Sequence, residues 1–376
     1  MHQQIIKQIN LHNFRNFTKQ QFIFQQPIVL LYGNNGIGKT NLLEAISLFG
    51  KNGSLRQANN LEMLNKQETF WQETFWQVSL DFTYDFACDF YYQNLAMHFE
   101  KNSNKKTWLI NQQNQSNSRQ SDLKNYLPNF ICLTPQLEQL FILGKTAKRD
   151  YLDKIVLDVN LQHQTYLNQY QKLLKERLLI LQQKSSNNNT WLEVIEKKIS
   201  ELAITIAFTR QEAISFFNQS IATFHSFFPK VILQIEDETE QNTHHLSGLE
   251  KEKFYQQQLN NNRQLDSISG KTNFGIHKAD FSAIFLAKNT LASYCSTGEQ
   301  KLIMLAISLA RAKISAYYKK QPTILLLDEV FSHLDNDYKK YLLTEIYDLQ
   351  IPAFFTATTN LMLPEGFCDK IDLIKL

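Results

Sequence analysis

The spacing of apolar residues predicts strands over the first 32 residues and a helix soon after them. KQINLHNF is followed by the Phe-rich stretch FTKQQFIF and by PIVLLYG, a short apolar run that fits a buried strand. GNNGIGKT interrupts the apolar pattern. NLLEAISLFG then shows helical spacing of its apolar residues between Leu42 and Leu48, with Gly50 as the expected end of the helix.

The middle and the end of the chain have different patterns. From about residue 66 to 110 the residues alternate and are rich in Phe, Tyr and Trp, which predicts antiparallel strands. From Gly144 to about Phe227 apolar residues recur three and four apart, and the loop residues KSSNNNT divide this stretch, so we expect a helical hairpin. The last part predicts helix 298–318, strand TILLLDE, helix 336–349 and strand PAFFTATT.

This order predicts an α/β fold interrupted by a mainly helical insertion. We expect a core built from residues 1–135 and 270–376, and a second, mainly helical lobe over residues 136–269 with a short helical hairpin. The apolar helix 298–318 carries Arg311 and Lys313, which argues against a membrane span. The N-terminus lacks the layout of a signal peptide, so we expect a cytoplasmic protein.

The amino-acid composition excludes few classes of function. The formal net charge is +3 and the sequence pI is about 8.4, which permits nucleic-acid binding without arguing for it. The four cysteines are scattered with no CxxC spacing, which argues against structural disulfides and a zinc site. His244 and His245 have no third ligand at metal spacing, and there is no nucleophile-elbow motif for Ser-His-Asp catalysis.

GNNGIGKT fits G-x-x-x-x-G-K-[ST] at every fixed position, after a predicted strand and at the start of a predicted helix, and therefore predicts a P-loop. The backbone N–H groups and the helix N-terminus would surround the phosphates of ATP. Lys39 would reach the β- and γ-phosphates, and the hydroxyl of Thr40 would bind Mg²⁺. The predicted nucleotide-binding residues are Gly33, Asn34, Asn35, Gly36, Ile37, Gly38, Lys39 and Thr40.

TILLLDEV predicts a strand buried on both faces that ends in two acids. Asp328 would hold Mg²⁺ through water, and Glu329 would accept a proton from the attacking water. Alone, paired acids at a strand end are often only solvated, but the P-loop in the same chain favours the catalytic interpretation. The following residues resemble the D-loop of ABC-type ATPases, which crosses to the partner subunit: Ser332, His333, Leu334 and Asp335.

CSTGEQK precedes the predicted helix 298–318 and is typical of a helix N-terminus, with Ser296 or Thr297 as the cap and Glu299 in the first turn. It also resembles the signature motif of ABC-type ATPases, which caps the γ-phosphate held by the P-loop of a second subunit. The two interpretations are compatible. The residues concerned are Ser296, Thr297, Gly298, Glu299 and Gln300.

Nearly the whole chain resembles the RecF family of bacterial recombination-repair ATPases. The segments that carry the resemblance, in order, are INLHNFRNF, YGNNGIGKTNLLEAI, LTPQLEQLFILGKTAKRDYLD, GIHKADF, CSTGEQK and LLLDEVFSHLD. The resemblance implies a head like those of SMC proteins and an ATP-dependent homodimer that binds single- and double-stranded DNA. It also implies weak, DNA-stimulated ATP hydrolysis, cooperation with RecO and RecR in bringing RecA to gapped DNA, and support of the SOS response.

The chain departs from the family pattern in places. GIHKADF has Ile276 and Lys278 where the family usually shows Pro and Arg, and Lys lacks the bidentate fork of Arg. Lys148-Arg149 occurs at the position where the family usually shows a pair of arginines. The late strand lacks the switch histidine of transporter ATPases, for which Thr356 or Thr358 would substitute. Gln136 is the candidate Q-loop residue and the second predicted catalytic residue.

Three functions remain open from the sequence. The leading hypothesis is an ATP-gated, DNA-binding dimer, in which Lys and Arg side chains around residues 145–177 either contact DNA or are only solvated. The second is the ATPase subunit of an ABC transporter. The sequence of the CSTGEQK motif, the NFRNF start and the helical insertion argue against it. The third is a monomeric P-loop kinase or metabolic NTPase, which leaves the CSTGEQK motif without a function.

Overall fold

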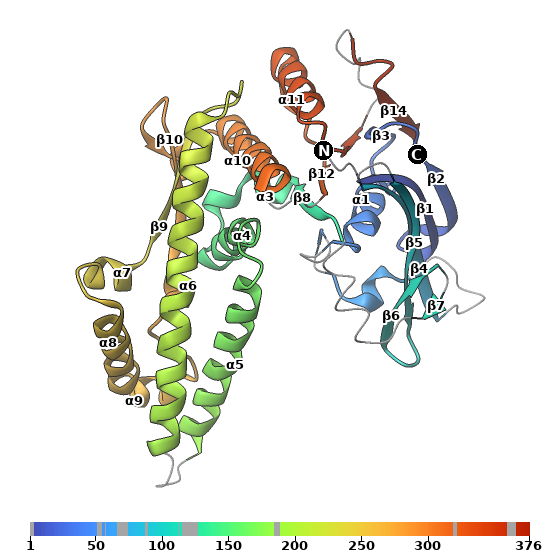
Figure 1. Ribbon diagram of the computed structural model, residues 1–376. Helices are drawn as coiled ribbons and strands as arrows, with labels where there is room; N and C mark the ends of the chain where they lie inside the picture. Colours follow the sequence, from blue (N-terminus) through green and yellow to red (C-terminus); the bar gives the residue numbers. More distant parts are fainter. Residues whose placement is uncertain are drawn as a thin grey trace. The chain divides into compact units, whose positions relative to one another are not determined.

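The computed structural model describes residues 4–50, 55–56, 58–65, 74–86, 89–111, 113–114, 127–183, 189–318, 322–358 and 366–376 (Figure 1). The chain divides into two compact units. The first unit comprises Met1–Glu138, Ser226–Phe228 and Met304–Leu376, and the second comprises Gln139–His225 and Pro229–Ile303.

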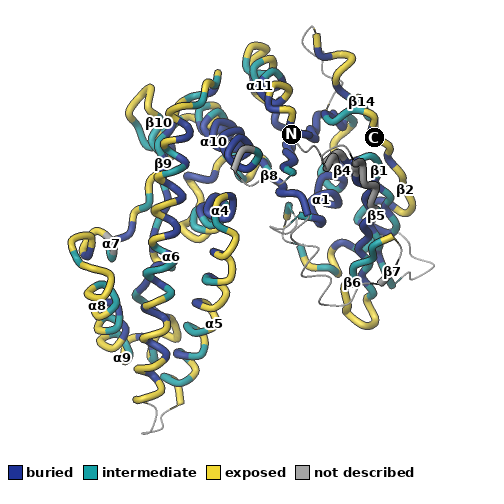
Figure 2. The backbone as a smooth tube through the Cα atoms, in the orientation of Figure 1, coloured by how far each residue is buried: buried dark blue, intermediate teal, exposed yellow. Residues whose placement is uncertain are grey.

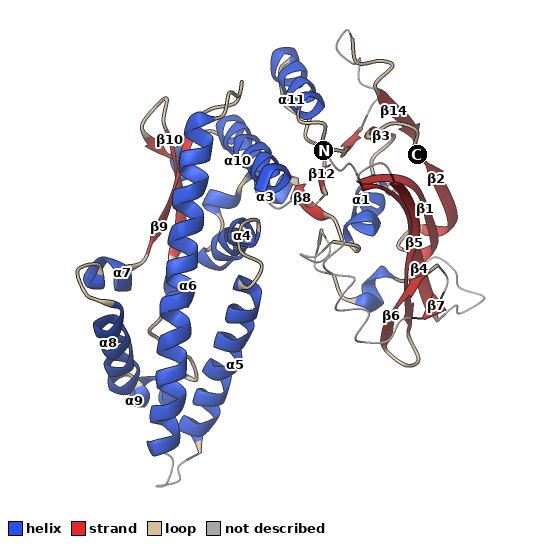
Figure 3. Cartoon of the chain, viewed as in Figure 1, coloured by secondary structure: helices blue, strands red, loops and turns tan. Residues whose placement is uncertain are grey.

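A parallel sheet forms the centre of the first unit (Figure 3). Its strands, in sheet order, are β14 (Ile371–Lys375), β3 (Ile28–Tyr32), β13 (Ala353–Ala357), β12 (Thr323–Leu327) and β8 (Asn129–Leu133). All residues of β12 and β13 are buried, as their unbroken apolar sequences require. Because every neighbouring pair is parallel, the segments after β3, β13 and β12 start at one edge of the sheet.

An antiparallel sheet makes up the second layer of the same unit. Its strands, in sheet order, are β2 (Phe17–Ile23), β1 (Gln4–Phe14), β4 (Phe75–Phe86), β5 (Asp89–Glu100), β6 (Lys105–Ile110) and β7 (Gln113–Asn114). The alternating apolar residues of this sheet and helix α1 (Lys39–Ser47) share one core, which includes the stacked pair Trp76 and Phe99. Each such buried apolar side chain contributes about 1.5–3 kcal/mol.

Four further helices belong wholly or partly to the first unit as the structure describes it. Helix α10 is buried over most of its length (Figure 2), and its first residues, up to Ile303, belong to the second unit. The elements are the 3₁₀ helix η1 (Asn60–Met63), α3 (Pro135–Glu138), α10 (Thr297–Tyr318) and α11 (Asn336–Asp348).

The second unit consists of helices and one small sheet. Its helices are α4 (Lys145–Leu157), α5 (His163–Gln182), α6 (Asn189–Thr223), α7 (Glu238–Thr243), α8 (Gly248–Asn261) and α9 (Arg263–Ser269), with 3₁₀ helices η2 (Leu140–Ile142), η3 (Ile276–Lys278) and η4 (Ala292–Tyr294). Its sheet has the order β11 (Thr290–Leu291), β10 (Asp280–Phe285), β9 (Val231–Glu236). Helices α5 and α6 lie side by side (Figure 1).

The small sheet determines where the second unit ends. β10 pairs antiparallel with β9, so residues after 270 remain in this unit as far as Ile303. The sequence pattern placed the return to the core at residue 270. The pairing of β9 with β10 joins residues more than 40 positions apart and leaves no local signal in the sequence. The polar stretch before Gly270 holds α7, α8 and α9. A capping box of Ser247 and Glu250 begins α8.

A buried ion network joins α5, α6 and α9. Arg177, fully buried, donates from Nε to Glu196 Oε1 (2.9 Å), from Nη1 to Asp266 Oδ2 (2.7 Å) and from Nη2 to the carbonyl of Leu259 (2.6 Å). Arg263 also contacts Glu196, at 2.6 Å. Two guanidinium groups thus balance two carboxylates, and each Arg177 donor nitrogen has an acceptor, which a buried charge requires.

Replacement of Arg177 with alanine is expected to destabilise the second unit by about 3–5 kcal/mol, because it removes the cation that pairs with the buried Asp266 and one of the two that pair with Glu196. Faster hydrogen–deuterium exchange in α5 and α6 would report this loss of stability within the second unit. Lys175→Ala, at an exposed position of the same helix, is the control and should stay within about 0.5 kcal/mol of the wild type. Equal exchange in the two variants would contradict the role given to the network.

Candidate nucleotide-binding site

The predicted P-loop connects β3 to the first turn of α1 and requires glycine at two of its turns. Gly36 and Gly38 have φ angles of 82° and 114°, which other residues rarely adopt. A Cβ atom on Gly38 would lie 2.5 Å from the side-chain nitrogen of Asn16. A side chain at position 38 would therefore collide with Asn16, which lies in the turn between β1 and β2.

Lys39 lies inside the loop rather than in solvent. Its Nζ donates to the carbonyl oxygens of Gly33 and Asn34, each at 2.8 Å, and the residue is 5% exposed. The first turn of α1 carries no acid, so its N–H groups and partial positive charge are available to an anion. Together these features favour binding of phosphate groups.

A chain of hydrogen bonds connects the P-loop helix with the acidic end of β12. The Thr40 hydroxyl donates to the carboxylate of Asp328, at 3.0 Å from Oδ1 and 3.1 Å from Oδ2. The Thr356 hydroxyl, at the end of β13, donates to Asp328 Oδ1 (2.7 Å) and accepts from the backbone N–H of Glu329 (2.7 Å). Three neighbouring strands thus place these four residues at one edge of the parallel sheet.

This donor set fits Mg²⁺. A hydroxyl and a carboxylate are both hard oxygen ligands. The Thr40 hydroxyl and the Asp328 carboxylate are already hydrogen-bonded to each other. Within the described ranges no cluster of three or more His, Cys, Asp or Glu side chains occurs. A site with so few protein ligands is typical of Mg²⁺ that also binds substrate phosphates and water.

The backbone turns sharply where the catalytic acid was predicted. Glu329 has a φ of 52° and is half-buried, one residue beyond Asp328. Its carbonyl accepts from the N–H of Ser332, so the predicted D-loop begins with a turn against it. Ser332, His333 and Asp335 are exposed, whereas Leu334 is buried; Asp335 caps α11 by accepting from the N–H of Tyr338 (2.8 Å).

Two further residues that hold the P-loop come from the NFRNF stretch between β1 and β2. Asn16 donates from its side chain to the carbonyl of Ile37 (2.7 Å) and accepts from Asn41 (2.8 Å). Arg15 makes a bidentate contact with Glu44, which is fully buried in α1. The sequence identified NFRNF as part of a family pattern but gave these side chains no task.

Gln136, the predicted Q-loop residue, is exposed in the short helix α3, three residues beyond β8. β8 pairs with β12 up to Leu327, and the N–H of Asp328 donates to the carbonyl of Leu133 (2.9 Å). Gln136 therefore follows the strand next to the acidic pair. Its catalytic role stays a prediction.

The predicted signature residues belong to the second unit and form a capping box. Ser296 Oγ accepts from the N–H of Glu299 (3.4 Å), and the N–H of Ser296 donates to Glu299 Oε2 (2.9 Å). Gln300 is buried and donates from its side chain to the carbonyl of Cys295 (2.9 Å). Ser296, Thr297 and Gly298 are exposed, and a Cβ on Gly298 would meet no atom within 4 Å.

The charge at this helix N-terminus is fixed by a lysine. Lys288 hydrogen-bonds to Glu299, and this contact, followed by those from Ser296, lowers the pKa of Glu299 to about 2. The carboxylate therefore stays ionised at neutral pH and keeps the cap formed. The Ser296 hydroxyl also donates to Glu299 Oε2 (2.9 Å), and the residues Ser296, Thr297 and Gly298 are exposed.

Residues 5–365 match the model of the RecF/RecN/SMC N terminal domain family. The sequence is 36% identical over 368 residues to the DNA replication and repair protein RecF of Rickettsia prowazekii (strain Madrid E), covering 98% of each chain. The chain belongs to the RecF family. It is also 36% identical over 370 residues to the RecF of Rickettsia typhi (strain ATCC VR-144 / Wilmington), again covering 98% of both.

Solved RecF structures have the same fold. The recombination mediator protein RecF-ATPrS in the RecFOR pathway aligns with 100% of this chain and 96% of that chain, with a TM-score of 0.80 and 24% identity. RecF-ATP aligns with 96% of each chain, with a TM-score of 0.79. The predicted family and the predicted α/β fold of the ABC/SMC head type are thereby confirmed. In the described part of the chain no helix is long and apolar enough to cross a bilayer.

Proposed function

We propose that this RecF-family chain is a cytoplasmic, ATP-dependent DNA-binding protein of replication and repair, and that its ATP-bound form is a homodimer. The contact chain from Thr40 through Asp328 and Thr356 to Glu329 is the observation that carries the proposal. It supplies what a phosphate-binding ATPase site needs at one sheet edge: a hydroxyl, a metal-binding carboxylate and a positioned acid.

In this proposal ATP binds with its phosphates in the P-loop. The backbone N–H groups after Gly36 and the ammonium group of Lys39 contact the phosphate oxygens. Thr40 and Asp328 would hold Mg²⁺, which would neutralise phosphate charge. Thr356 fixes the backbone of Glu329 through the 2.7 Å bond to its N–H, so that Glu329 can accept a proton from water. Thr356 thereby takes the place of the switch histidine of transporter ATPases, and Thr358, which is exposed, is not needed for it.

The second part of the proposal is that each ATP site is completed by the partner protomer. The open turn Ser296–Gly298 offers a hydroxyl and an N–H group at a helix N-terminus, which favour a γ-phosphate. Loss of the γ-phosphate would then separate the two protomers. Hydrolysis acts as a timer on a binding protein, and we expect it to be weak and DNA-stimulated.

DNA is the substrate that the family membership favours, since the Rickettsia relatives are named as DNA replication and repair proteins. We propose binding of single- and double-stranded DNA through phosphate contacts, with little readout of base sequence in the duplex. The finer parts of the proposal are action at gap junctions, cooperation with RecO and RecR in loading RecA, and support of the SOS response.

Glu329→Gln tests this function, because it should slow hydrolysis and leave ATP binding intact. With ATP and Mg²⁺ the variant is expected to sediment as a dimer and to retain a labelled gapped duplex in a mobility-shift assay. With ADP it should sediment as a monomer and release the DNA. The wild type with ATP should pass from the first state to the second over time.

Two other functions give different results in the same assays. A monomeric metabolic NTPase predicts no nucleotide-dependent dimer in gel filtration. A transporter ATPase subunit predicts ATP-dependent dimers without DNA retention. The family match over residues 5–365 includes the whole second unit as well as the ATP site, which favours the DNA-binding protein over both.

A further inference from the structure

The second unit contains a polar hollow of about 1010 Å³ that the ATP site does not use. It is lined by α4, the end of β9, α7, α8 and residues 273–279, all within the second unit. Its volume lies at the upper end of the ~300–1,000 Å³ usual for small-ligand pockets.

Three cationic side chains line one part of this hollow: Lys145, Arg149 and Lys278. Arg149 is fixed, because it donates to the carbonyl of Ala279 (3.0 Å) and to the Thr146 hydroxyl (3.1 Å). Lys278 is exposed, and Lys145 is 64% exposed. The ammonium group of Lys145 also lies 4.0 Å from Asp280 Oδ2. A guanidinium held by two hydrogen bonds and two exposed ammonium groups favour a phosphate group.

The GIHKADF segment is built to hold its position. Gly275 has a φ of 137°, and a Cβ there would lie 2.5 Å from the Tyr170 hydroxyl. His277 lies between that hydroxyl (3.1 Å from Nδ1) and the carbonyl of Thr272 (2.9 Å from Nε2). Asp280 binds Lys148 at 2.6 Å. These contacts fix the backbone on both sides of Lys278, so its ammonium group has a defined base at the hollow.

The remaining lining suits the base of a nucleotide. Phe254 and Phe274 line the hollow as an edge-on pair with centroids 6.2 Å apart, and both are partly exposed. The side-chain amides of Gln241 and Gln258 lie in the same lining, whereas the Asn273 side-chain nitrogen already donates to Asp266 (2.9 Å). Aromatic faces for stacking, amides for base edges and cations for phosphate are the groups with which proteins bind unpaired nucleotides.

Two acids also line the hollow, and neither prevents this use. Asp237 is buried and accepts from the N–H of Thr239 (2.9 Å), so its carboxylate begins α7. Glu236 is exposed at the end of β9. Both come from the β9–α7 connection, whereas the cations come from α4 and η3.

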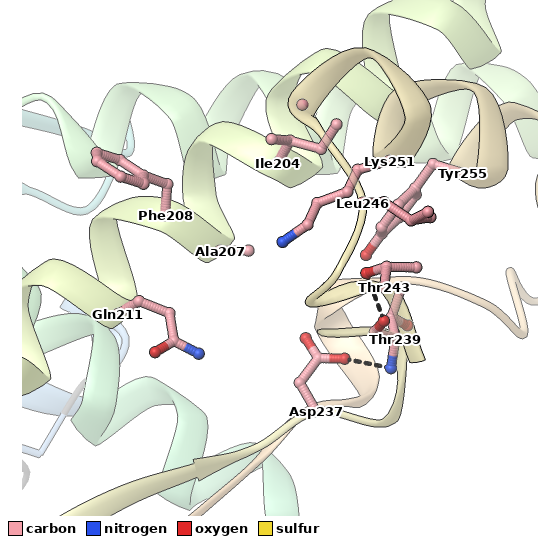
Figure 4. A pocket seen from close by; sticks show the side chains of 11 residues that line it. Ile204, Ala207, Phe208, Gln211, Asp237, Thr239, Thr243, Leu246, Lys251 and Tyr255 are labelled. Carbon is pink, nitrogen blue, oxygen red and sulfur yellow. Dashed lines mark hydrogen bonds between the residues drawn. The ribbon is translucent and has the colours of Figure 1, made fainter. Parts of the chain in front are cut away.

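A second hollow, of about 380 Å³, shares Asp237 and Thr239 with the first (Figure 4). Its lining is more apolar, with Ile204, Ala207 and Phe208 on α6, and its one cationic side chain is Lys251. It therefore lacks the combination of several cations with amides, and its lysine serves as a control.

We propose that the 1010 Å³ hollow binds an unpaired nucleotide unit of single-stranded nucleic acid, with its phosphate at Lys145, Arg149 and Lys278 and its base against Phe274. A base inside a duplex is stacked and paired on both faces and cannot enter such a site without being extruded. The site is separate from the P-loop and needs neither ATP nor a dimer. It adds a single-strand contact to the proposed DNA-binding function.

The test is fluorescence polarisation of labelled oligothymidylate of about ten nucleotides, a length within the range of single-strand sites, without ATP and at several salt concentrations. Lys278→Gln should weaken binding several-fold and reduce the slope of log affinity against log salt by about 1. Phe274→Leu should weaken binding about tenfold and leave the slope unchanged, because stacking releases no counterions.

Lys271→Gln is the matched control, because Lys271 is an exposed lysine just before the GIHKADF segment that does not line the hollow. Lys251→Gln probes the neighbouring hollow. Both should bind as the wild type does. An equal loss in Lys271→Gln and Lys278→Gln, a loss in Lys251→Gln alone, or wild-type affinity in Phe274→Leu would each overturn the proposal. Thermal unfolding of each variant separates lost binding from lost folding.

Competition distinguishes the sources of the ligand. Thymidine monophosphate should displace the oligonucleotide at high concentration, whereas inorganic phosphate at the same concentration should not. Displacement by phosphate alone would mean a simple anion site and would overturn the proposal, as would equal competition by duplex and single strand. Failure here leaves the Glu329→Gln result with ATP and gapped duplex unaffected, so the two proposals can fail independently.

Discussion

Replacing Lys39 with alanine is expected to lower the affinity for ATP by at least about 100-fold. Each hydrogen bond from a charged donor is worth about 1.5–3 kcal/mol, and an ammonium group between two phosphates makes two of them. In the structure Nζ is already inside the P-loop, 2.8 Å from the carbonyls of Gly33 and Asn34. Isothermal titration calorimetry with ATP and Mg²⁺ measures the loss.

Lys340→Ala is the matched control for this variant. Lys340 is an exposed lysine of α11 in the same unit, and its loss changes the net charge by the same amount. Wild-type ATP affinity in Lys340→Ala with none in Lys39→Ala would assign the effect to the P-loop. Unchanged affinity in Lys39→Ala, with normal thermal unfolding, would contradict the assignment of Gly33–Thr40 as the nucleotide site.

The parts of the ATP site that could be predicted are those coded within a few residues of each other. The P-loop glycines and Lys39 form one motif, and Asp328 and Glu329 directly follow an unbroken apolar strand. Their meeting at one sheet edge follows from the parallel arrangement of β3 and β12, which the buried apolar runs imply.

Other residues of the site act over distances that a sequence pattern does not record. Asn16 reaches the carbonyl of Ile37, 21 positions away, and the Thr356 hydroxyl reaches Asp328, 28 positions away. An Asn in a turn and a Thr in a strand are common, so neither stands out without the fold. Thr356 was one of two candidates for the switch position, and its contact with Asp328 favours it over Thr358.

The extent of the second unit is another long-range property. The pairing of β10 with β9 places the GIHKADF segment and CSTGEQK in the unit that also contains the helical hairpin. The P-loop and the signature motif, which one ATP molecule would need to contact together, therefore belong to different units of the chain. In the proposed dimer the signature motif would meet the P-loop of the partner protomer, so a substitution in this motif is the sharpest test of the shared site.

Ser296→Arg is expected to abolish the ATP-dependent dimer while the monomer binds ATP as the wild type does. Ser296 is exposed and its hydroxyl takes part in the capping box with Glu299, so an arginine there fills the open turn with a long side chain. Loss of the cap costs only about 1 kcal/mol, and the buried length of α10 preserves the helix. Sedimentation velocity in the Glu329→Gln background reports the dimer, and calorimetry reports ATP binding.

Ser293→Arg makes the same chemical change at an exposed residue before the cap and serves as the control. It should dimerise normally if the open turn itself meets the γ-phosphate of the partner. Equal loss of dimer in both variants would mean that added positive charge, rather than the occupied turn, prevents association. Loss of ATP binding by the Ser296→Arg monomer would mean that the motif acts within its own chain, and the shared site would have to be abandoned. Only loss of the dimer with unchanged ATP affinity, confined to Ser296→Arg, is consistent with a signature that acts across the dimer.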